Sequence, residues 1–173
     1  MKRHIIHGLL IAALAVLSGC LVCGQNIIIE PFDFTGKTGD PIESFDVDLN
    51  TNADYKEHKD DIKSIDGISV VAQIVNNTGT PARARIYISD DPNLSSRVEI
   101  MEKATLVFES PEVPGNGSLL VDWEDSFKRI RNPDELKRQI LGDGIFTVYG
   151  ITQSTPFSVT VKGEIVLTLT ACK

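Results

Sequence analysis

Hydrophobic and polar residues alternate with a period of two through much of this chain. The clearest example is the C-terminal segment 157–171, where apolar residues and one glycine hold every odd position and mostly polar residues hold the even ones. This period places one side of a β-strand in a core and the other side in water. A two-residue turn at Gly163 would bring apolar residues opposite polar ones. We therefore expect one long strand bent at Gly163, in preference to a three-residue loop.

Other segments also have the character of strands, because they alternate or form short apolar runs between turn-forming residues. They cover residues 27–34, 44–50, 68–75, 82–88, 104–109, 118–123 and 145–151. This pattern predicts an all-β fold, an antiparallel β-sandwich of about seven to eight strands, immunoglobulin-like or similar. The turn residues over 76–81 predict a hairpin. Trp123 ends an apolar segment, so we expect it in the core, with an exposed binding platform as the alternative.

One short helix is predicted near 132–142. Asn132 is suited to cap its start, Pro133 to its first turn, and Glu135 to the position three residues after the cap. Apolar residues then share one face, and a glycine ends the run. We expect this helix to cover one open end of the sandwich. Residues 54–65 could form a further helical turn or a solvated connection.

The N-terminus has the three parts of a secretory signal. Lys2 and Arg3 are basic, an almost unbroken apolar run covers 5–17, and small residues precede Cys20. About 13 apolar residues are too few for a membrane-spanning helix, which needs roughly 20. No later segment is as long and as apolar, so we expect no spanning helix in the mature chain.

The string Leu17-Ser18-Gly19-Cys20 resembles the lipobox of bacterial lipoproteins. The resemblance implies that the thiol of Cys20 carries a diacylglyceryl group and that the residues before it are removed. It also implies a lipid anchor in the bacterial cell envelope, since two or three acyl chains hold a protein where one is marginal. Leu21 stands where Asp tends to retain such proteins at the inner membrane, which favours the outer membrane if the cell is Gram-negative. An ordinary secretory signal is the alternative.

The sequence predicts three regions: a signal over 1–19, a short lipidated tether over 20–26 and a single sandwich domain over 27–173. A mature chain of about 150 residues is long enough to bury a core. The tether reaches roughly 20 Å when extended, which places the domain close to the membrane. The net charge of the whole chain is −7, and this acidity argues against nucleic acid and against anionic lipid headgroups as partners.

Three cysteines are present. If Cys20 carries lipid, Cys23 and Cys172 remain as a pair that an oxidising envelope would allow to form a disulfide. Two free thiols near the chain ends are the alternative. A redox motif made of Cys20 and Cys23 fails if the first sulfur is alkylated.

Candidates for chemistry are few. The loop residues Asp90, Asp91 and Asn93 offer oxygen ligands of the kind that calcium takes, but they are also common turn formers and lack EF-hand spacing. We expect no cofactor and no catalytic residue. His58 is the one histidine after the signal, and it lies in a charged run, so we expect it to be exposed on the surface. No Gly-x-Ser-x-Gly motif is present. Five basic residues interspersed with acidic ones predict a salt-bridged, solvated face; they are Lys128, Arg129, Arg131, Lys137 and Arg138.

These features predict a membrane-anchored envelope lipoprotein with a non-catalytic binding or accessory domain. The sequence does not identify its protein or ligand partner. One alternative is a carrier of a lipid or another apolar ligand, which would need an apolar cavity between the sheets. Another is a glycan hydrolase, which would need two carboxylates that face each other across a cleft.

Overall fold

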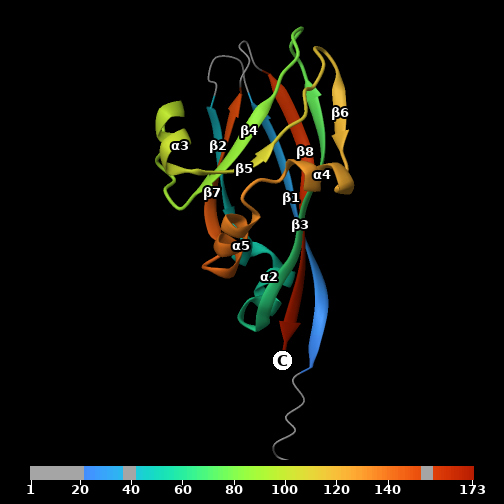
Figure 1. Cartoon of the computed structure of the whole chain (residues 1–173), viewed down its shortest axis with the longest axis vertical. Coiled ribbons are helices and arrows are strands. Elements are labelled where there is room, and N and C mark those ends of the chain that lie inside the picture. Colours follow the sequence, from blue (N-terminus) through green and yellow to red (C-terminus); the bar gives the residue numbers. More distant parts are fainter. Residues whose placement is uncertain (1–21, 37–41, 153–157) are drawn as a thin grey trace, which may run out of the picture.

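The computed structural model describes residues 22–36, 42–152 and 158–173. In these residues the chain forms two four-stranded antiparallel sheets that face each other (Figure 1). Sheet A has the order β1 (Cys23–Gly36), β8 (Val159–Cys172), β3 (Ile62–Asn76) and β6 (Ser118–Val121). Sheet B has the order β2 (Ile42–Asp48), β7 (Ile145–Thr152), β4 (Ala84–Ser89) and β5 (Thr105–Glu109). The predicted all-β sandwich is confirmed.

The strand order is that of a jelly roll, in which most connections pass from one sheet to the other. An immunoglobulin sandwich divides its strands differently. Among the described strands, β4 and β5 are the only consecutive pair within one sheet. The predicted hairpin at 76–81 is therefore wrong, because β3 lies in sheet A and β4 in sheet B. Turn residues fit a crossing between two sheets as well as they fit a tight hairpin.

Helices or helical turns lie in three of the described connections, β2 to β3, β4 to β5 and β6 to β7. The predicted helix near 132–142 is present as α5 (Pro133–Leu141). The open question over 54–65 is resolved as α2 (Ala53–His58) with the 3-10 turns Leu49–Thr51 and Lys59–Asp61 beside it. Two further helices, α3 (Arg97–Lys103) and α4 (Trp123–Arg129), were not predicted.

The cap of α5 differs from expectation. Asn132 has a left-handed backbone, with φ 44°, and its side chain makes no hydrogen bond to the helix start. Its amide nitrogen donates to the carbonyl oxygen of Leu106 at 2.9 Å instead. The side chain therefore fastens the start of the helix to β5.

The long C-terminal strand is continuous, as expected, but a bend is not what requires glycine at position 163. The register of β8 with both neighbours passes through Gly163 without a shift. A Cβ atom there would lie 2.5 Å from the carbonyl oxygen of Val71 and 2.7 Å from the Cβ atom of Ala72. The glycine is needed because β3 approaches β8 too closely for a side chain.

The buried residues form two main clusters along the sandwich. One contains Tyr55 of α2 together with Leu136 and Ile140 of α5. The other includes Ala82 and Val113, from the segments just outside β4 and β5. Figure 1 places α2 and α5 where the long strands of sheet A continue past the end of sheet B. The helices therefore close the core at that end.

The N-terminal strand begins earlier than predicted. Residues 23–26, expected in the tether, belong to β1, and the backbone of Val22 exchanges two hydrogen bonds with Lys173 at 3.0 and 3.1 Å. Cys20 lies outside the described residues. Within the part of the chain that the structure describes, no helix has the length and apolar character needed to cross a membrane.

Candidate functional site

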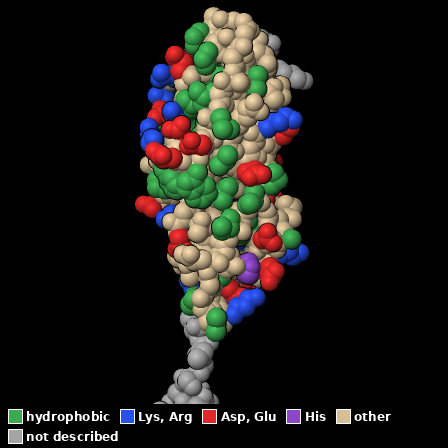
Figure 2. All heavy atoms as spheres, turned by 90° about the vertical axis from the view of Figure 1, so that its right-hand side faces the viewer, with side chains coloured by type: hydrophobic (Ala, Val, Ile, Leu, Met, Phe, Trp, Pro, Cys, Tyr) green, Lys and Arg blue, Asp and Glu red, His purple; other side chains and the backbone are tan. Residues whose placement is uncertain are grey.

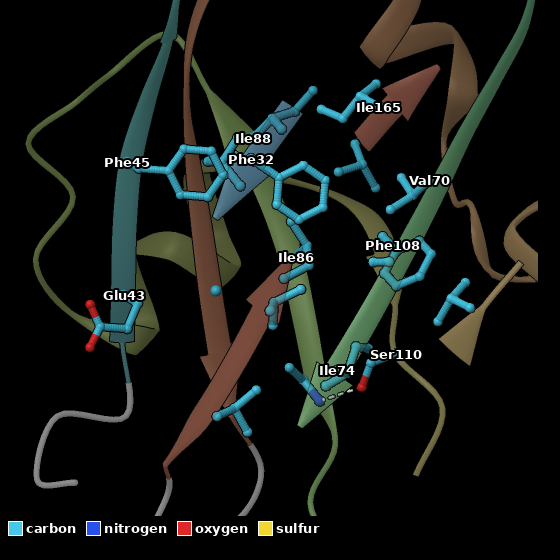
Figure 3. Close-up of a pocket in the computed structure, with 18 of the residues that line it drawn as sticks. Phe32, Glu43, Phe45, Val70, Ile74, Ile86, Ile88, Phe108, Ser110 and Ile165 are labelled. Carbon is cyan, nitrogen blue, oxygen red and sulfur yellow. Dashed lines mark hydrogen bonds between the residues drawn. The ribbon is translucent and has the colours of Figure 1, made fainter. Parts of the chain in front are cut away.

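An apolar cavity of about 130 Å³ lies between the two sheets (Figure 3). Its walls come from strands of both sheets, from α5 and from the segments that connect the sheets. In Figure 3, Phe45 and Ile86 of sheet B project toward Phe32, Val70 and Ile165 of sheet A. The alternation that builds each strand therefore aims apolar side chains into this space.

The cavity exists because the inward-facing side chains of the two sheets do not fill the space between the sheets around Ile86. Phe32, Phe45, Val70, Ile86 and Ile165 line the cavity and point inward, yet each is only half-buried. Ile86 contacts both main core clusters. The unfilled volume thus lies where one cluster meets the other.

The polar groups of the wall lie at one end, where β2 and β4 begin and β7 ends. They are supplied by Glu43, Arg83, Ser110 and Thr152. Ser110 Oγ accepts a hydrogen bond from the backbone nitrogen of Ala84 at 2.8 Å, drawn in Figure 3, and Arg83 pairs with Glu112 at 3.4 Å. Glu43 is the only carboxylate among the described lining residues. The remainder of the wall is alkyl and aromatic, which suits an uncharged apolar group.

The candidate calcium ligands are not brought together as a metal site. Asp90 lies 3.4 Å from Arg138, and the carboxylate of Asp91 accepts a hydrogen bond from the backbone nitrogen of Asn93 at 2.9 Å. Within the described ranges, no group of three His, Cys, Asp or Glu side chains is placed to hold a metal ion. The loop is instead held by Tyr149, whose hydroxyl donates to the carbonyl oxygen of Asp91 at 2.6 Å. Burial, the main cause, raises the pKa of Tyr149.

Three of the five basic residues around α4 and α5 form ion pairs on the surface, as the charge pattern indicates, whereas Arg129 is half-buried and its Nε atom has no hydrogen-bond partner among the described residues. Lys128 pairs with Glu124 at 2.9 Å, Arg131 with Glu109 at 3.1 Å, and Arg138 with Glu135 at 2.6 Å. His58 was expected to be exposed, but it is half-buried and its Nδ1 atom is buried without a hydrogen-bond partner.

Cys23 and Cys172 are joined in a disulfide with a sulfur–sulfur distance of 2.09 Å. The two residues are also register partners at the ends of β1 and β8. The bond therefore ties the start of the described domain to its end.

Trp123 is not in the core, contrary to expectation. β6 ends at Val121, and Asp122 caps α4 by accepting a hydrogen bond from the backbone nitrogen of Asp125 at 2.8 Å. Trp123 begins this helix with 41% of its surface exposed, and its ring lies edge-on to that of Phe127 with centroids 5.5 Å apart. An N-cap Asp followed by acidic residues in a first turn is a helix-start signal that could have revealed this.

Comparisons with known proteins give no family. No family model matches this chain, and no curated protein matches it. Among solved structures, the chain is similar to one of Desmodium yellow mottle tymovirus, with 10% identity and a TM-score of 0.32 over 84% of this chain and 88% of that one. It is also similar to a chain of the T13 IBDV viral particle (12% identity, TM-score 0.28) and of infectious bursal virus derived T=1 particles (13%, 0.26), over 84% of this chain and 31% of those chains. TM-scores this low carry no argument about function.

Proposed function

We propose that this protein is a lipid-anchored protein of the bacterial envelope whose jelly-roll domain is non-catalytic and binds a small apolar group between its sheets. The observation that carries the binding role is the apolar cavity of about 130 Å³. Its alkyl and aromatic wall supplies contact area and removes a ligand from water, which favours binding over reaction.

The size of the cavity sets the size of the ligand. In another protein, an engineered apolar cavity of about 150 Å³ stays dry and binds benzene or xenon. A cavity of about 130 Å³ accordingly suits one aromatic ring or the end of an acyl chain. A carrier that encloses a whole lipid would need several hundred Å³, so we propose capture of a single apolar group.

Benzene and xenon are suitable probes of this proposal. Methyl NMR of the purified protein should show saturable shifts at Val70, Ile86 and Ile165, which line the cavity. Benzene should also raise the midpoint of thermal unfolding, because a ligand that binds only the folded state stabilises it. Shifts confined to surface methyl groups would overturn the proposal.

A filled cavity gives the matched comparison. We expect Val70→Phe to occupy the space and abolish the benzene shifts while the protein stays folded. Val98→Phe introduces the same ring on α3, where Val98 is exposed, and should leave benzene binding unchanged. If the two variants bind benzene equally, the cavity is not the site.

The lipid anchor is tested separately. Cells grown with a labelled fatty acid should label the wild-type protein, and Cys20→Ser should carry no label. Equal labelling of both proteins would contradict lipidation at Cys20 and would leave the cavity experiment unaffected.

A further inference from the structure

The outer face of sheet A carries exposed apolar side chains on its two edge strands, β1 and β6, beside the mostly polar side chains that β8 turns to water as an antiparallel sheet normally does. Strand register identifies this face, since paired residues lie side by side and alternate residues along a strand share a face. Ile29 pairs with Val166, and Val166 pairs with Ser69. Ile28, between the exposed Ile27 and Ile29, is fully buried in the core. Ile27 and Ile29 therefore point away from the core.

The same face continues to the opposite edge of the sheet. Along β3, residues 69, 71 and 73 share one side, and Gln73 pairs with Leu120 of β6. Leu120 is 64% exposed, beside 63% for Ile27 and 46% for Ile29. Apolar side chains thus lie at both edges of one sheet face, about three inter-strand spacings of roughly 4.8 Å apart across the strands. Register places Leu120 level with Asp33, so it also lies about 13 Å further along the strands than Ile29.

Helix α4 adds aromatic surface at the β6 edge. It begins two residues after β6 ends and packs against β3, where Ser126 Oγ accepts a hydrogen bond from the backbone nitrogen of Val70 at 2.7 Å. This contact buries one side of the helix and leaves Trp123 and Phe127 41% and 50% exposed. Figure 2 views this side of the molecule and shows hydrophobic side chains along the face, with a larger group at one edge.

Register places Asp33, Lys162 and Glu164 on this face, and Asp66 on the same face accepts a hydrogen bond from the hydroxyl of Thr170 at 2.7 Å. Lys162 pairs with Asp33 at 2.9 Å, and Glu164 stands between Pro31 and Val71. A surface with little unpaired charge loses less hydration energy when it leaves water.

We propose that this outer face of sheet A lies on the lipid bilayer, with the side chains of Ile27, Ile29, Leu120, Trp123 and Phe127 in the interfacial region. The proposal rests on the lipid anchor at Cys20. That anchor stands two residues before Val22, whose backbone is paired with Lys173 at the end of the same sheet. This end of the sheet stays close to the lipid attachment, because two extended residues reach only about 7 Å.

The position of the anchor selects the bilayer as the occupant of this face. Ile27 and Ile29 lie seven and nine residues along the chain from Cys20, or about 23 and 30 Å in extended strand. A strand lying along the membrane places both side chains at the lipid surface. Trp is enriched at the membrane–water interface, and Trp, Phe and Leu form the apolar faces of helices that lie in it.

Trp123 is the only tryptophan in the chain and therefore reports directly on this contact. The purified chain starting at Cys20 would be coupled through that thiol to a maleimide phospholipid and mixed into phosphatidylcholine vesicles, with the Cys23–Cys172 disulfide kept intact. We expect a blue shift of Trp123 emission, loss of most of it with brominated lipid chains, and protection from aqueous iodide. Unchanged emission with full iodide quenching would overturn the proposal.

Two variants make the test specific. Ile27→Thr combined with Ile29→Thr should return Trp123 toward the emission and iodide quenching of the free domain. Val98→Thr, which changes an exposed valine on α3 beyond sheet B, should not. Iodide protection without quenching by brominated lipid would indicate a second copy or another protein on this face and would also overturn the proposal.

Because the lipid is attached chemically in the vesicle experiment, the test of the docking face does not depend on whether cells lipidate Cys20. If wild-type cells fail to lipidate Cys20, the proposed anchor is wrong whatever the vesicle experiment shows. If Cys20 is lipidated in cells but Trp123 in the coupled protein stays in water, the anchor stands and the docking face is wrong.

Discussion

The hydroxyl group of Tyr55 donates a hydrogen bond to the carbonyl oxygen of Ile140 at 2.6 Å and so joins α2 to α5. Tyr55 has no exposed surface, and Lys59 lies 5.8 Å from the centre of its ring. Gly144, with φ +75°, borders the same hydroxyl, because a Cβ atom there would lie 2.6 Å from the oxygen. This contact fastens the two helices that close one end of the core.

Tyr55→Phe removes this bond without removing the ring. We expect a loss of about 1–3 kcal/mol in the free energy of unfolding, because the carbonyl oxygen of Ile140 stays buried and loses its side-chain donor. Urea denaturation of the two proteins measures the difference. A variant as stable as the wild type would contradict a structural role for the bond.

The free energy of unfolding should also fall at alkaline pH because of Tyr55. Burial raises the pKa of Tyr55, and the nearby charges of Asp143 and Asp48 raise it further. A raised pKa in the folded state stabilises the fold fully below the unfolded value of about 10, and this contribution is lost as pH rises through the higher folded value. The loss above pH ~10 should be smaller in Tyr55→Phe, although Tyr149 continues to contribute to it.

Gly163→Ala should strongly destabilise the fold. The added methyl group would meet the backbone of Val71 and the side chain of Ala72, and overpacking of this kind costs about 1–3 kcal/mol or more. Gly24→Ala is the matched control, because a Cβ atom there meets nothing within 4 Å. Thermal and urea unfolding of both variants test the contrast, and equal effects would refute the close approach of β3 to β8 as the reason for Gly163.

Reduction of the Cys23–Cys172 disulfide should lower stability. The bond spans a sequence separation of 149 residues, and loss of a native disulfide typically costs about 2–5 kcal/mol. We expect the urea midpoint of the wild type to fall in reductant and that of a Cys23→Ala, Cys172→Ala double variant to stay unchanged. Thiol counting on the folded mature protein supplies the direct check, and free thiols at both positions would refute the bond.

Acid should weaken helix α5 through Glu135. The hydrogen bond from Arg138 lowers the pKa of Glu135. A lowered pKa stabilises the fold above the unfolded value of about 4.3, and this contribution is lost as pH falls through the folded value. Because the side chain of Arg138 is 58% exposed, solvent screening limits the effect to at most about 1 kcal/mol. Glu135→Gln should flatten the stability profile below pH ~4.3.

The pattern of the chain predicts strands better than their partners. Alternation over 157–171 anticipates the continuous strand β8, since local periodicity shows which side chains share a face. The turn residues after Asn76 indicate only that the strand ends. Whether the chain then pairs with the same sheet or crosses to the other depends on where distant strands already lie, so the expected hairpin was wrong.

The candidate site was harder to predict than the strands. In the sequence, each residue of the cavity wall has the pattern of an ordinary core residue. Alternation shows that a side chain points inward, but it does not show whether side chains of the opposite sheet fill the space that it faces. Trp123 was expected in the core because it ends an apolar run, but the cap at Asp122 turns the chain into α4. The N-cap at Asp122 therefore decides that Trp123 begins a helix, although the apolar pattern before it continues up to Trp123.

The sequence alone determined the β-sandwich class, the α5 segment and the expectation of an anchor at Cys20, because alternation, helix signals and the lipobox are local patterns. Tertiary structure decided the jelly-roll order, the pairing of Cys23 with Cys172, the cavity near Ile86 and the exposed face that includes Ile29. Each of these depends on which distant segments come together. Packing between sheets sets that arrangement, and it depends on the shapes of many side chains at once.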